Sequence, residues 1–148
     1  VEVEVVVVVV VGVEVVVEVG VVAVVVVGVM NVFLYGTLRR GQYNSGLVYL
    51  QGGAYLRLAA LKGAEMFSLN GGLCPGVVLT DDKSKVVYGE LVSIDVDVLS
   101  TLDQLEGHPL FYKRELLTVE DGKAWVYVFQ HEVYPEDKIK SGDWLNRH

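Results

Sequence analysis

Short runs of β-branched and aromatic residues recur along the chain from residue 30 onward, separated by glycine, asparagine, aspartate or proline. Runs of this length and composition are typical of β-strands. They predict strands at residues 32–35, 54–60, 65–69, 77–79, 86–94, 114–119 and 124–130. The Asp121-Gly122 pair between the last two runs predicts a hairpin. Many short strands with little helix favour an α+β fold, a small, mostly antiparallel β-barrel with flanking helices.

Residues 94–107 carry the clearest helical pattern. At about 100° per residue, one apolar stripe forms from Val98, Leu99, Leu102 and Leu105. Asp95 or Asp97 can cap the start of this helix, and Gly107 suits the position just beyond its end. A second, short helix is predicted over residues 44–50, with Asn44 as its cap, although Gly46 weakens that prediction.

The first 29 residues differ sharply from the rest, because 21 of them are valine and every glutamate there lies at an even position. A period of two indicates extended chain. Within this segment the longest uncharged runs, residues 5–13 and 19–29, are shorter than the roughly 20 residues that a membrane helix needs, and no basic region precedes a cleavage site. We therefore expect residues 1–29 to lie outside the functional domain, which spans residues 30–148, and we expect no membrane association.

Charge and cysteine content exclude several classes of protein. The formal net charge is −7, and four glutamates without a Lys or Arg in the first 29 residues supply −4 of it, so no basic surface for nucleic acid is expected. The only cysteine, Cys74, cannot form an internal disulfide, and three scattered histidines do not make a metal set. These features predict a cytoplasmic protein without a metal or other cofactor.

Glu106 is the first candidate for chemistry. Its position projects with the apolar stripe, and it lies at the helix end where the macrodipole disfavours an anion. Both effects raise the pKa of a carboxyl group, and a carboxyl group poised between its two forms is suited to proton transfer. Taken alone, the same position also fits a frayed helix end with a solvated side chain.

The loop after the first strand of the domain is the second candidate. Gly36 allows close approach of the backbone, and Thr37 adds a hydroxyl beside the amide N–H groups that a strand end leaves free. Such a turn can bind a carboxylate. An ordinary strand-ending turn would look the same, so this loop gains meaning only together with Glu106.

Taken together, these residues resemble the γ-glutamylcyclotransferase-like family, including its γ-glutamylamine cyclotransferase (AIG2-like) branch. The resemblance rests on YGTLRRG at 35–41 with Asn44, LDQLEG at 102–107 and FYKR at 111–114, and it covers nearly all of residues 30–148. It implies a pocket for a γ-glutamyl group, with Glu106 as the proton acceptor. It also implies a binding loop of Tyr35, Gly36, Thr37 and Leu38, with Tyr127 as a pocket wall or a core aromatic.

The implied reaction is intramolecular. The α-amine of a γ-glutamyl amide attacks its own γ-carbonyl, which releases an amine and 5-oxoproline and requires no cofactor. A non-catalytic module that binds a small ligand or a protein in the same pocket is the alternative. A glycosidase would need a second inward carboxylate, and the candidates are Asp103 and Glu90. Arg114 is expected to pair with an acid, Arg39 and Arg40 to be solvated, and Tyr112 either to pack or to line the pocket.

Overall fold

The computed structural model describes residues 15–19, 22–26 and 30–148. Within the valine-rich segment it places two strands, β1 (Val15–Val19) and β2 (Val22–Val26), which pair antiparallel. The extended conformation expected from the period of two is therefore confirmed for these ten residues. The remaining positions of the segment, including Glu2, Glu4 and Glu14, lie outside the described residues.

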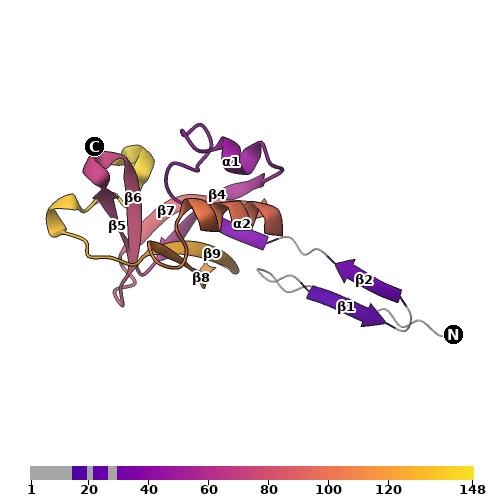
Figure 1. Ribbon diagram of the computed structural model, residues 1–148. Helices are drawn as coiled ribbons and strands as arrows, with labels where there is room; N and C mark the ends of the chain where they lie inside the picture. The colour runs from indigo at the N-terminus through magenta and orange to yellow at the C-terminus, as the bar shows by residue number, and fades with distance from the viewer. Residues whose placement is uncertain (1–14, 20–21, 27–29) are drawn as a thin grey trace.

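The domain is built on a five-stranded mixed sheet in the order β4-β7-β3-β9-β8 (Figure 1). Its strands are β3 (Met30–Leu34), β4 (Ala54–Lys62), β7 (Val86–Ile94), β8 (Tyr112–Val119) and β9 (Gly122–Phe129). Three of the four pairings are antiparallel, and β3 pairs with β9 in parallel. A separate antiparallel pair is formed by β5 (Ala64–Leu69) and β6 (Cys74–Leu79).

The expectation of a β-barrel is not confirmed. Among the described residues β4 and β8 remain the two edges of the five-stranded sheet, and no strand ladder joins them. The edges approach through side chains instead, since Arg57 on β4 forms ion pairs with Glu120 and Asp121 in the turn after β8. The α+β class is correct, but the sheet is open and mixed.

The hairpin between β8 and β9 turns one residue earlier than expected. Val119 pairs with Gly122, so Glu120 and Asp121 form the two-residue loop, and Gly122 already belongs to β9. Glu120 has φ +55°, in the left-handed region that such loops require.

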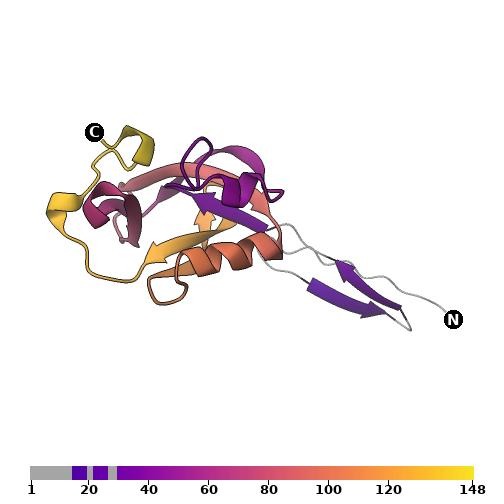
Figure 2. The ribbon, with the colours of Figure 1, turned by 45° about the horizontal axis from the view of Figure 1, so that its top comes forward.

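Two helices lie near each other beside the sheet, and α2 runs across β3 and β9 (Figure 1 and Figure 2). The longer helix, α2 (Val96–Leu105), is capped by the Asp95 side chain, which accepts a hydrogen bond from the Val98 N–H at 2.9 Å. The shorter helix, α1 (Gly46–Tyr49), has Ser45 rather than Asn44 at its N-cap position, so that part of the prediction is wrong. Single 3₁₀ turns lie at Asn70–Gly72, Pro135–Asp137 and Trp144–Asn146. No helix in the described parts of the chain has the length and hydropathy needed to cross a membrane.

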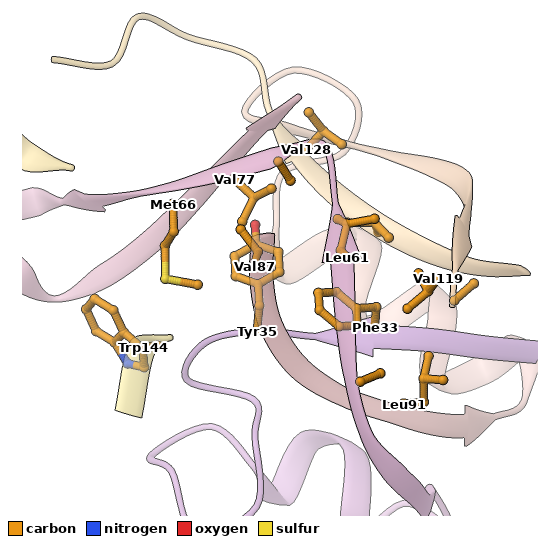
Figure 3. Packing of buried hydrophobic residues seen from close by; sticks show 14 of the residues in the cluster. Phe33, Tyr35, Leu61, Met66, Val77, Val87, Leu91, Val119, Val128 and Trp144 are labelled. Carbon is orange, nitrogen blue, oxygen red and sulfur yellow. The ribbon is translucent and has the colours of Figure 1, made fainter. Parts of the chain in front are cut away.

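Alternating side chains of the central strands fill two cores. Phe33 on β3 and Tyr35 just after it point into one core, together with side chains from β5, β6, β7 and β9. Figure 3 shows this core in close view. Met30, Val32 and Leu34 point the other way, toward α1 and α2. Because β3 is central and buried on both faces, its carboxyl end is held firmly, and the loop that follows it starts from a fixed point.

Candidate active site

A pocket of about 700 Å³ opens where the carboxyl end of β3 meets the end of α2. Its walls come from the loop after β3, the α2 terminus, the start of β6 and the segments around β8 and β9. All six residues singled out in the sequence line it: Tyr35, Gly36, Thr37, Leu38, Glu106 and Tyr127. The structure thus brings the two sequence candidates, 70 residues apart, into one cavity.

Glu106 follows directly after α2 and ends it. Its N–H donates to the Leu102 carbonyl at 2.9 Å, and Gly107 then turns the chain with φ +62°. None of the described residues donates a hydrogen bond to the Glu106 carboxylate, and burial raises its pKa to about 7. The side chain is therefore partly charged at neutral pH, rather than fully solvated as a frayed end would leave it.

The loop after β3 presents unused hydrogen-bond donors. The backbone N–H groups of Gly36, Thr37 and Leu38 donate to no acceptor among the described residues. The Thr37 hydroxyl accepts a hydrogen bond from the Asn44 side-chain amide at 3.1 Å, which fixes its rotamer. Three unpaired N–H groups beside one cavity form the kind of site that binds an anion.

Gly36 is also required by the packing of β6. A Cβ at this position would come within 2.6 Å of the Pro75 ring, so a larger residue would clash there. Tyr35 closes the floor beside it, since its hydroxyl donates to the Tyr127 carbonyl at 2.6 Å. Burial raises the pKa of Tyr35, and the neighbouring Tyr112 and Glu106 raise it further, so this phenol stays protonated.

The expectation that Arg39 and Arg40 are both solvated is wrong for Arg39. Its guanidinium is buried, with ion pairs to Glu90 at 3.1 Å and to Asp143 at 3.0 Å. The other Glu90 oxygen accepts from the Arg40 N–H at 3.0 Å and from the Tyr49 hydroxyl at 3.1 Å. The Glu90 carboxylate therefore connects the segment after β3 to β7 and α1. Glu90 itself does not line the pocket.

Asp103 also serves the structure of the pocket wall. It accepts hydrogen bonds from Arg114 at 2.9 Å and from the Tyr127 hydroxyl at 2.7 Å, which confirms that Arg114 pairs with an acid. Neither Asp103 nor Glu90 faces Glu106 across the cavity, so the paired carboxylates of a glycosidase are absent from the described residues that line it. Tyr127 is both a core aromatic and a pocket wall.

Other lining residues were missed in the sequence or left undecided there. Tyr112 both packs and lines the pocket, with its hydroxyl donating to the Pro75 carbonyl at 2.8 Å. Phe111, which belongs to the FYKR element of the resemblance, also lines the pocket, as do Phe129 and His131, whose strand and loop positions gave no signal in the sequence. Among the described residues, no group of three His, Cys, Asp or Glu side chains is placed to hold a metal ion.

Fold and site together define a small α+β protein with a ligand-sized pocket, one carboxyl group poised for proton transfer and a loop of free N–H groups. A family model described as "Gamma-glutamyl cyclotransferase, AIG2-like" matches residues 32–146. The chain therefore belongs to the gamma-glutamyl cyclotransferase, AIG2-like family.

Individual relatives agree with this assignment. The Gamma-glutamylcyclotransferase family protein YtfP of Escherichia coli K12 is 36% identical over 114 residues, which are 77% of this chain and 95% of that protein. Gamma-glutamylaminecyclotransferase B of Danio rerio is 33% identical over 120 residues, covering 77% of this chain and 62% of that protein.

Solved structures share the fold. The solution structure of Escherichia coli ytfP superposes with a TM-score of 0.60 at 35% identity, over 80% of this chain and 98% of that one. The crystal structure of a mouse aig2-like protein gives a TM-score of 0.63 at 26% identity, over 74% and 82% of the two chains.

Proposed function

We propose that the protein converts a γ-glutamyl amide to 5-oxoproline and a free amine, with Glu106 as the general acid and base. The observation that carries this proposal is the Glu106 carboxyl group, which lines the pocket, has a pKa of about 7 and accepts no hydrogen bond from the described residues, as fits a group that exchanges protons with a substrate. The family to which the chain belongs supports this type of reaction.

In the proposed mechanism the substrate supplies its own nucleophile. The Glu106 carboxylate takes a proton from the α-ammonium group, and the freed amine attacks the γ-carbonyl carbon to close a five-membered ring. The bond from that carbon to the leaving nitrogen then breaks as Glu106 returns the proton to this nitrogen. The ring nitrogen loses its second proton, and the departing amine takes up one proton in exchange and leaves as an ammonium ion. Holding the substrate in the folded conformation supplies much of the rate enhancement.

The loop of Gly36, Thr37 and Leu38 would bind the α-carboxylate of the substrate through its free N–H groups. The same donors can stabilise the oxyanion that develops on the γ-carbonyl. Tyr35 and Tyr127 would close the inner end of the pocket around the aliphatic part of the glutamyl group. The reaction as drawn requires no metal and no covalent intermediate.

Release of 5-oxoproline tests the proposal directly. A γ-glutamyl amino acid and ε-(γ-glutamyl)-lysine are offered to the wild-type chain and to Glu106→Gln, with the exposed Glu136→Gln as a control. We expect the first variant to lose at least about 100-fold in rate and the control to keep wild-type activity. The wild-type rate should rise with pH through about 7, as the Glu106 carboxyl group becomes a base.

Equal release by wild type and Glu106→Gln would refute the role of this carboxylate. No release from any γ-glutamyl amide, with folding intact, would favour the non-catalytic module.

A further inference from the structure

The outer part of the pocket is lined by aromatic rings that the proposed chemistry does not use. The ring of His131 lies 5.5 Å from that of Phe111 and 5.7 Å from that of Phe129, and Phe129 lies 5.3 Å from Tyr112, each distance between ring centroids. We call Phe111, Phe129 and His131 the aromatic wall. Its rings continue from half-buried Tyr112 to the protein surface.

Phe111 contacts Gly107, the residue after Glu106, and lines the same pocket as Glu106. Its N–H donates to the Gly107 carbonyl at 3.0 Å, and its ring packs so closely that a Cβ on Gly107 would come within 2.8 Å of it. Gly107 directly follows Glu106. In the proposed mechanism the leaving nitrogen receives its proton from Glu106, so the substituent on that nitrogen would begin on the side of the pocket where Gly107 and Phe111 lie.

Folding alone does not explain where the Phe111 ring lies. The residue is 60% exposed although it lines the cavity, and it belongs to neither buried core. A large apolar side chain held at the mouth of a pocket is suited to bind a ligand. The described residues that line this pocket include no Lys, Arg or Asp, and Glu106 is the only Glu among them, so the wall offers no lysine or arginine partner to an anionic leaving group and no acidic partner beyond Glu106 to a cationic one.

We propose that the aromatic wall binds the amine portion of the substrate, and that the preferred substrate is the γ-glutamyl amide of an arylalkyl amine. This inference rests on the function proposed above. The rings of the wall meet at tilted and edge-on angles, and a ring of the ligand that packs against them would add aromatic contacts to the gain from burying its apolar surface.

Matched substrates test the inference with the full chain. Initial rates of 5-oxoproline release are compared for γ-glutamyl-phenethylamide, γ-glutamyl-methylamide and γ-glutamyl-cadaverine, which differ only in the leaving amine. We expect kcat/KM for the phenethylamide to exceed that for the methylamide by at least about tenfold, the gain from withdrawing part of one ring from water. The cationic cadaverine amide should react more slowly than the phenethylamide.

Variants at the wall separate binding from general damage. Phe111→Ala should lower kcat/KM for the phenethylamide about tenfold more than kcat/KM for the methylamide, whereas Phe111→Leu should keep part of the preference. The neighbouring Leu110 is 76% exposed and does not line the pocket, so Leu110→Ala is the matched control and should change neither rate.

The outcomes separate the two proposals. Equal rates for phenethylamide and methylamide, or a faster cadaverine amide, would overturn the aromatic assignment and leave the reaction intact. An equal loss on both substrates in Phe111→Ala would give Phe111 a structural role instead. No 5-oxoproline from any of the three amides would refute the proposed function itself, and the inference with it.

Discussion

At the scale of single residues, the environment of Glu106 favours its protonated form. Burial at the end of α2 raises the pKa of this carboxyl group from 4.5 to about 7, and no described residue compensates by donating a hydrogen bond. The folded protein therefore binds a proton more tightly at this position than the unfolded chain does. That difference ties stability to pH.

Glu106 should make the wild-type protein less stable as the pH rises from about 4.5 to above 7. Below that window the carboxyl group is protonated in both states, and above it the folded state holds an unfavourable charge. The free energy of unfolding of Glu106→Gln minus that of wild type should increase by about 1–3 kcal/mol from pH 5 to pH 8. Urea unfolding of both proteins at the two pH values measures this gain.

The comparison between the two proteins cancels the other titrating groups, because the variant retains all of them. The same stability difference at pH 5 and at pH 8 would show that the carboxyl group titrates near its ordinary pKa.

At the scale of elements, the loop after β3 is held by one buried carboxylate. Glu90 on β7 accepts from Arg39, Arg40 and Tyr49, and Asp143 adds a second partner for Arg39. These contacts involve Arg39 and Arg40 at the end of the loop, while the N–H groups of Gly36, Thr37 and Leu38 donate to none of the described residues. The Arg39–Glu90 ion pair therefore positions the loop without occupying the N–H groups of the residues that line the pocket.

Glu90→Gln should destabilise the protein by about 3 kcal/mol, since it leaves the Arg39 guanidinium buried with half of its countercharge. The matched control is Glu120→Gln, which weakens an ion pair with Arg57 whose side chains are 42% and 38% exposed. Exposed pairs contribute little, so the control should lose less than about 1 kcal/mol.

Thermal and urea unfolding measure both losses. Similar small losses in the two variants would mean that the buried pair contributes no more than the exposed one.

Sequence reasoning located most elements because their signals are local. The Asp95 cap, the apolar stripe of α2 and Gly107 together define one helix, and the structure has it. Strand 86–94 was predicted to the residue. Arg39 was misjudged because its partners, Glu90 and Asp143, lie 51 and 104 residues away. The aromatic wall escaped for the same reason, since nothing near Phe129 or His131 in the sequence reveals which cavity they line.

At the scale of the whole molecule, the parallel pairing of β3 with β9 could not be predicted from the hydrophobic pattern of the sequence. Alternation of polar and apolar residues indicates which side chains of a strand are buried. It does not reveal which strand pairs with it in parallel, here through Val32 and Trp125, 93 residues apart. The pairing matters for the site, because it lays Tyr127 beside the carboxyl end of β3, where the Tyr35 hydroxyl donates to its carbonyl.

A chain that begins at Met30 should fold and react like the full-length protein. Met30 is the first residue of β3 and is buried against α2, and the family match begins at residue 32. The melting temperature and the rate of 5-oxoproline release should both stay within experimental error of the full chain, and solubility should rise because the valine-rich tract is removed.

Loss of folding or of activity on this truncation would make residues 1–29 part of the working domain. Full-length protein refolded in parallel is the control.

The two ends of the pocket differ in how many amino-acid substitutions they can tolerate during evolution. The inner end joins a central strand to a helix terminus, where Gly36 touches Pro75 and Glu106 completes α2, so few replacements there would be tolerated. The mouth is formed largely by connecting segments at 107–111 and 130–131, which carry little of either core. Under the proposed function, substitutions in those segments would alter the accepted amine while the reaction persists, and one scaffold could then give rise to enzymes for different amides.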